Sequence, residues 1–116
     1  MPSSKLPQVR LGHILDEIDL ISAATSGMDA QFIMDDYVVG RAVERAIQII
    51  SEAAKELTPE VRALEPGVPW PEIIGIGNLL RHEYYRIKKV EIQAILTDHL
   101  PRLRPAIIRL IARFEP

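Results

Sequence analysis

The helical spacing of apolar residues constrains this sequence more than any other feature, because it runs through almost the whole chain. Residues 39–57 are the clearest case. Apolar side chains recur there at every third or fourth position, with charged and amide side chains between them. This spacing places the apolar residues on one side of an α-helix, where they can pack against other helices. The same pattern over residues 7–25 predicts a first helix before it.

Residues with special backbone or capping properties mark where these two helices should end. Gly27 can adopt the left-handed conformation that closes the first helix. Asp35 or Asp36 is suited to cap the N-terminus of the second helix, and Pro59 would stop that helix at its far end.

A proline-rich loop should separate the second helix from a third. Residues 65–71 contain three prolines, which excludes a helix interior there. We expect the ring of Trp70 to pack under the bundle and anchor this loop. Helical spacing returns over residues 71–84, and again over residues 89–114. We expect the last region to be divided by a cap at Asp98 and a restart at the proline three residues later.

These elements predict an all-α fold, an up-and-down four-helix bundle with a split or extra C-terminal helix, formed as a single domain of residues 1–116. The chain contains no cysteine, which excludes disulfides and thiolate metal sites and suits a reducing compartment. No apolar run approaches the roughly 20 residues that a membrane-spanning helix needs. We therefore expect a cytoplasmic protein without a membrane segment.

Acidic and basic residues separate along the chain, although the formal net charge is only −2. Residues 11–36 contain six acidic residues and no Lys or Arg. Residues 81–113 contain eight basic residues against three acidic ones. The asymmetry has two interpretations: a surface that faces a polyanion, or oppositely charged helices that pack side by side.

The densest group of polar functional residues lies near the end of the third expected helix. Asn78, His82 and Arg86 are spaced four residues apart, which places them on one side of that helix. Arg81 and Tyr84 border the same end. No pair of histidines has metal-ligand spacing with a carboxylate nearby, so we expect neither a metal nor a cofactor. The group is either a functional site or a polar helix end.

Three stretches of the sequence add to this group. They are residues 42–53 (AVERAIQIISEA), 69–75 (PWPEIIG) and 78–84 (NLLRHEY). In this order they resemble the second-helix signature, the following loop and the core motif of the HepT-like branch of the HEPN superfamily. That core motif is an Arg, four residues, a His, one residue and a Tyr. His82 and Tyr84 stand at its His and Tyr positions.

The resemblance implies a metal-independent endoribonuclease that acts as a homodimer, with two motifs facing each other across a cleft. His82 would move protons to and from the reacting oxygens of RNA. The motif Arg would stabilise charge on the phosphorane, but this chain has Gly77 at that position. Arg81 lies one helical turn later and leans toward the same space, so the expected catalytic residues are His82, Arg81 and Asn78. A glycine inside a helix lowers its stability, so Gly77 has two interpretations: a close backbone approach, for example across the dimer, or neutral drift.

The resemblance also implies partners and modification. Family members are ribonuclease toxins paired with MntA-type minimal nucleotidyltransferases, which act as the antitoxin. The partner would transfer AMP to Tyr84, and the added charge would repel RNA phosphate from the cleft. Glu52 would support the site by orienting the catalytic imidazole, or it is a solvated residue on a helix face. The residues expected to bind RNA are Arg86, Lys88 and Lys89.

The leading interpretation is therefore the ribonuclease toxin of a toxin–antitoxin pair. The alternative is a catalytically inactive helical adaptor that binds a nucleotidyltransferase, with Gly77 marking a lost active site. A third is an unrelated helical interaction module with an accidental motif match. If expression of the chain alone harms the host cell, and the harm depends on His82, the protein is the enzyme and not the adaptor. A nucleotidyltransferase gene adjacent to the gene for this chain would favour the enzyme or the adaptor over the unrelated module.

Overall fold

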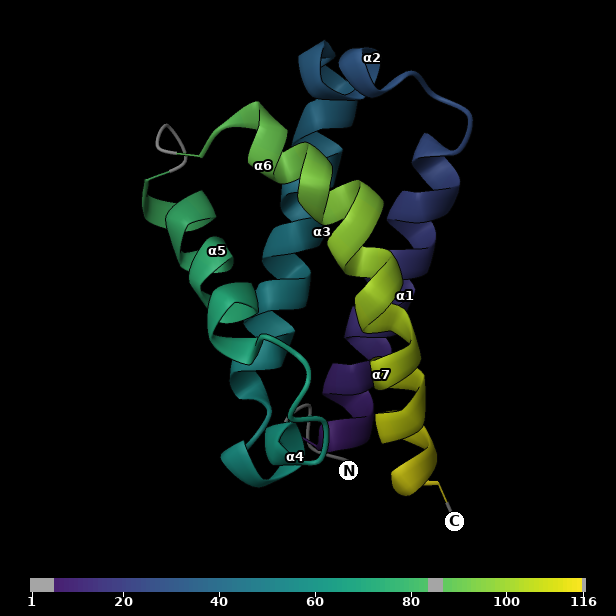
Figure 1. The fold of residues 1–116 in the computed structure, drawn as a ribbon, viewed down its shortest axis with the longest axis vertical. Coiled ribbons are helices and arrows are strands. Elements are labelled where there is room, and N and C mark those ends of the chain that lie inside the picture. The colour runs from purple at the N-terminus through teal and green to yellow at the C-terminus, as the bar shows by residue number, and fades with distance from the viewer. Residues whose placement is uncertain (1–5, 84–86, 116) are drawn as a thin grey trace.

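Aliphatic side chains at helical spacing bring four long helices together in the computed structural model, which describes residues 6–83 and 87–115. These helices are α1 (Pro7–Thr25), α3 (Tyr37–Glu56), α5 (Trp70–His82) and α7 (Leu100–Arg113), and they alternate in direction along the long axis (Figure 1). Within the described ranges there is no strand, and no helix combines the length and apolarity needed to cross a membrane. The predicted all-α, up-and-down bundle is confirmed.

The core of the bundle lies between α1, α3 and α7. Leu11, Ile14, Val43, Ile107 and Leu110 have no exposed surface. Burial of each such aliphatic side chain stabilises the fold by about 1.5–3 kcal/mol. The fourth long helix, α5, packs mainly against α3 and lies at the edge of the bundle (Figure 1). The position of α5 therefore depends mainly on its contact with α3.

Polar caps fix where the helices at one end of the bundle begin. The Asp36 carboxylate accepts a hydrogen bond from the Val39 N–H at 3.0 Å, as expected for the cap of α3. A short helix that the sequence pattern did not predict, α2 (Ala30–Asp35), precedes it and is capped by Asp29. Six residues are too few to show helical spacing. Gly27 has a φ of 77° and closes α1, as predicted.

The loop before α5 is held by its aromatic residue. After α4 (Pro59–Ala63) the chain turns, and the ring of Trp70 is buried with 6% of its surface exposed. Its indole N–H donates to the carbonyl oxygens of Arg62 at 3.0 Å and Glu65 at 3.1 Å. The expectation that Trp70 anchors the loop is confirmed. This anchor fixes where α5 starts.

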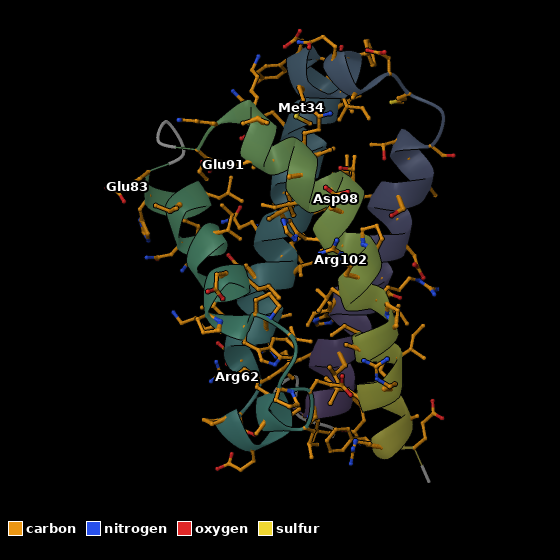
Figure 2. The ribbon with its side chains drawn as sticks, in the orientation of Figure 1. Met34, Arg62, Glu83, Glu91, Asp98 and Arg102 are labelled. Atoms are coloured by element: carbon orange, nitrogen blue, oxygen red, sulfur yellow. The ribbon has the colours of Figure 1, made fainter. Side chains whose placement is uncertain are left out.

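The C-terminal helical region is divided by a wide turn rather than a cap. It runs through α6 (Lys89–Ala94), the π-helical turn η2 (Ile95–His99) and then α7 without leaving helical backbone geometry. Asp98 lies exposed on η2 and caps nothing, so the predicted cap was wrong (Figure 2). The wide turn ends directly before α7. Pro101, near the start of α7, has no backbone N–H and so cannot donate a hydrogen bond to a carbonyl oxygen of the wide turn.

Ion pairs join the acidic first third of the chain to its basic last third. Arg104 on α7 donates two hydrogen bonds to Asp19 on α1, at 2.7 and 3.1 Å. The ammonium of Lys89 on α6 lies 2.9 Å from the carboxylate of Asp35 on α2. For these residues the interpretation that oppositely charged helices pack side by side is confirmed.

Candidate functional site

The helices α3 and α5 approach closely where Gly77 meets Ser51. Both residues are buried, and the Ser51 hydroxyl donates a hydrogen bond to the Ile74 carbonyl oxygen at 2.9 Å. A Cβ added at position 77 would overlap both Oγ and Cβ of Ser51. The close approach that the glycine indicated therefore lies within one chain. At this helix spacing an arginine cannot occupy position 77, where the resemblance expects the motif Arg.

A shallow pocket of about 270 Å³ opens beside this contact. It is lined from α3 by Glu52 and Lys55, and from α5 by Asn78 and Arg81, with Gly77 on its floor. Two residues of the expected catalytic group, Asn78 and Arg81, thus border one pocket. The polar and charged side chains that line the pocket suit a charged ligand.

Arg81 reaches across this pocket to α3. Its guanidinium lies 3.7 Å from the carboxylate of Glu52, and both side chains are more than one-third exposed. The same carboxylate accepts a hydrogen bond from the Gln48 amide at 3.3 Å. An exposed pair of this kind contributes only about 0–1 kcal/mol to stability. Its main effect is to place the guanidinium at the pocket that Gly77 also lines.

His82 is the last residue of α5 and is exposed. It lies one helical turn after Asn78, so the two residues share a side of the helix. From the sequence, Glu52 either orients the His82 imidazole or is a solvated residue on a helix face. In the structure Glu52 contacts Arg81, the residue before His82. His82 does not line the pocket itself, but it is exposed and follows directly after Arg81, which does.

Of the other expected site residues, those that the structure describes, Lys88 and Lys89, do not line this pocket. Tyr84 and Arg86 lie outside the described residues. Lys88 is exposed just before α6. Lys89 is turned toward α2, where it pairs with Asp35. Figure 2 shows Glu83, at the end of α5, and Glu91, on α6, on two separate elements at the same edge of the molecule.

Polar residues of α3 form a second pocket that the sequence did not predict. Arg41, Glu44, Arg45 and Gln48 line it with Leu80 of α5. They lie opposite the apolar stripe of α3, and all but Arg41 fall within the 42–53 stretch that carries the resemblance. Within residues 6–83 and 87–115, no group of three or more His, Asp or Glu side chains is arranged to hold a metal ion.

Comparison with known proteins adds to this geometry. A family model described as "Ribonuclease HepT-like" matches residues 14–110. A putative RNase from Caldanaerobacter subterraneus subsp. tengcongensis is 31% identical over 109 residues, covering 94% of this chain and 97% of the relative.

Two archaeal proteins are also similar. A putative RNase from Methanocaldococcus jannaschii is 28% identical and covers 84% of this chain and 89% of its own length. A probable ribonuclease HepT from Thermococcus cleftensis is 28% identical and covers 81% and 86%. No solved structure gives a significant match.

Proposed function

Because this chain belongs to the Ribonuclease HepT-like family, we propose that it is a metal-independent endoribonuclease whose site lies at the end of α5. The observation that carries this proposal is the placement of Arg81. Glu52 holds its guanidinium at the edge of a pocket that Asn78 also lines, one residue before the exposed His82. The domain that acts is residues 1–116, and its location is the cytoplasm.

In the proposed reaction the 2′-oxygen of a ribose attacks the adjacent phosphorus while the bond from phosphorus to the 5′-oxygen breaks. One proton leaves the 2′-hydroxyl and one reaches the 5′-oxygen. The His82 imidazole would act as the general base or acid for these proton transfers. The product carries a 2′,3′-cyclic phosphate. No metal is needed to activate the nucleophile.

Arg81 supplies the positive charge in this scheme. Negative charge grows on the phosphoryl oxygens as the fifth bond to phosphorus forms, and a fixed guanidinium nearby stabilises it. The Asn78 amide can donate a hydrogen bond to the same oxygens. Gly77 cannot contribute a side chain, so Arg81 takes the role of the motif Arg from one turn further along.

Two finer elements belong to the same proposal. A homodimer would bring two His82 side chains to one cleft, so that one acts as base and the other as acid. Light scattering should then give twice the 13.1 kDa chain mass.

An MntA-type nucleotidyltransferase would act as antitoxin by transferring AMP to Tyr84. Coexpression with such an enzyme and ATP should add the mass of AMP to native protein but not to Tyr84→Phe.

The test of the proposed activity is cleavage of total and transfer RNA by purified protein in the presence of EDTA. Native protein should release fragments with 2′,3′-cyclic ends, and His82→Ala should not. His13→Ala is the matched control, because His13 is an exposed helical histidine on α1. Equal cleavage by native protein and His82→Ala would overturn the proposal.

The adaptor is the second candidate, and Gly77 at the motif Arg position is the observation that favours it. An adaptor would bind the nucleotidyltransferase and leave RNA intact. Freshly made, unmodified protein that cleaves no RNA but forms a stable complex with the partner enzyme would establish that alternative.

A further inference from the structure

The outer face of α3 carries a row of polar side chains beside the proposed site. We define this outer face as Tyr37, Arg41, Arg45, Gln48, Glu52 and Lys55. Their spacing of three or four residues places them on one side of the helix, opposite the core. The row spans about 27 Å, at a rise of 1.5 Å per residue. It is as long as an extended segment of several nucleotides.

Residues of this face line both pockets between α3 and α5. Glu52 and Lys55 line the site pocket with Arg81. Arg41 and Arg45 line the second pocket, toward the N-terminal end of α3. The pockets share no lining residue, but both draw on this one helix face, and the proposed catalytic group lies beside the site pocket.

The charges of this face are unevenly compensated. Arg41 pairs with Glu44 at 2.9 Å, and Arg81 pairs with Glu52 at 3.7 Å. Arg45 and Lys55 are both exposed, and neither side chain has an ion-pair or hydrogen-bond partner within the described part of the chain. Two uncompensated cations are thus available for anionic groups of a ligand, although the chain as a whole has a net charge of −2.

An aromatic ring lies at the end of the row. Tyr37 is 75% exposed, and the guanidinium of Arg41 lies 5.1 Å from the centroid of its ring. Exposed aromatic rings combined with basic side chains are the usual means of binding single-stranded nucleic acid, because bases stack on the ring while cations hold the phosphates. A protein partner would instead favour an apolar centre without uncompensated charge, which this face lacks.

We propose that the outer face of α3 is a binding track for single-stranded RNA leading into the site pocket. Arg45 and Lys55 bind phosphates, and Tyr37 stacks a base at the far end. The inference rests on the proposed ribonuclease function and adds to it the route that the substrate takes. It places RNA contacts on α3, whereas the sequence had placed them on residues 86–89.

The test is binding of a fluorescein-labelled 2′-O-methyl RNA oligonucleotide of about 12 nucleotides, a length within the usual range of single-strand binding sites. The methyl group removes the attacking hydroxyl, so anisotropy reports binding without cleavage. Arg45→Gln and Lys55→Gln should each weaken binding and lower the slope of log K against log salt by about 0.7. Tyr37→Ala should weaken binding by about 5- to 150-fold. Arg102→Gln, an exposed cation on α7, should leave binding unchanged.

The outcomes separate this inference from the function on which it rests. Weakened binding by these variants, with no cleavage by native protein, would support the track and overturn the ribonuclease. Cleavage by native protein, with Arg45→Gln and Lys55→Gln binding as tightly as native, would overturn the track alone. Absence of probe binding by native protein would overturn it too. The track would also be overturned if these variants lowered the mass measured by light scattering and left RNA binding unchanged. The face would then join two copies of the chain.

Discussion

Gly77 and Ser51 determine how closely α5 can approach α3, and this contact gives a prediction at the scale of single residues. Gly77→Ala should lower the free energy of unfolding by about 1–2 kcal/mol. The new Cβ meets the Cβ of Ser51, which no rotamer change can move, and this overpacking outweighs the helix preference of alanine. Urea unfolding measures the change.

Gly75→Ala is the matched control for that substitution. Gly75 lies two residues away on the same helix, and an added Cβ there meets nothing within 4 Å. Its replacement should raise stability by up to about 1 kcal/mol. Pairing Gly77→Ala with Ser51→Gly should recover part of the loss. Equal stabilities of the two single alanine variants would show that the helices are not held at this spacing.

Arg81 gives the second prediction at this scale. Arg81→Ala should lower kcat/KM for RNA cleavage by about 10²–10³-fold, the usual cost of removing one donor that stabilises transition-state charge. The comparison is Arg102→Ala, an exposed arginine on α7 far along the chain from the site (Figure 2). Unchanged cleavage by Arg81→Ala would exclude it as the substitute for the motif Arg.

The sequence predicted part of this site and missed the rest for a physical reason. Asn78, Arg81 and His82 are local to one helix, so their spacing alone shows that they share an end of it. The contacts of Gly77 with Ser51 and of Arg81 with Glu52 join residues far apart in the chain. Such pairs depend on how two helices pack, and neither periodicity nor a motif records that packing.

At the scale of elements, the start of α3 depends on one carboxylate. Asp36→Ala should lower the free energy of unfolding by about 1 kcal/mol, because the Val39 N–H loses its acceptor. Asp16→Ala, at an exposed position inside α1, is the control and should have a smaller effect. Thermal and urea unfolding both measure the difference. Equal losses in the two variants would show that the cap contributes nothing specific.

The long helices were predictable because each carries several turns of apolar spacing and clear end signals. The first helix was expected over residues 7–25, and α1 has these bounds. The short α2 and the π-helical turn η2 were not expected. Too few residues form them for a pattern to emerge, and η2 departs from the 3.6-residue period by which a helix is recognised in a sequence.

At the scale of the whole molecule, ion pairs between distant segments make stability depend on pH. Hydrogen bonds from Arg104 hold the pKa of Asp19 below its ordinary value, and those from Arg109 do the same for the pKa of Glu65. A carboxyl group with a lowered pKa binds fewer protons in the folded chain than in the unfolded chain. Its stabilising contribution is therefore present above the ordinary carboxyl range and is lost as the pH falls.

The urea concentration at the unfolding midpoint should consequently decrease as the pH is lowered from about 5 to about 3. The double variant Arg104→Gln/Arg109→Gln should be less stable than native protein near neutral pH, and its midpoint should change less over the same interval. Arg102→Gln should follow the native curve. A double variant with the same pH dependence as native protein would show that these pairs are not its source.

The buried indole that anchors the loop before α5 also provides an intrinsic optical signal. Trp70 is the single tryptophan of the chain, so all indole fluorescence comes from the first residue of α5. Its neighbour Pro71 lines the site pocket, and the indole N–H donates to the carbonyl oxygens of Arg62 on α4 and of Glu65 in the loop that follows. The fluorescence emission of unlabelled protein therefore reports the polarity around the N-terminus of α5, the helix that carries His82. A titration with oligonucleotide that shifts this emission would follow occupancy of the pocket directly.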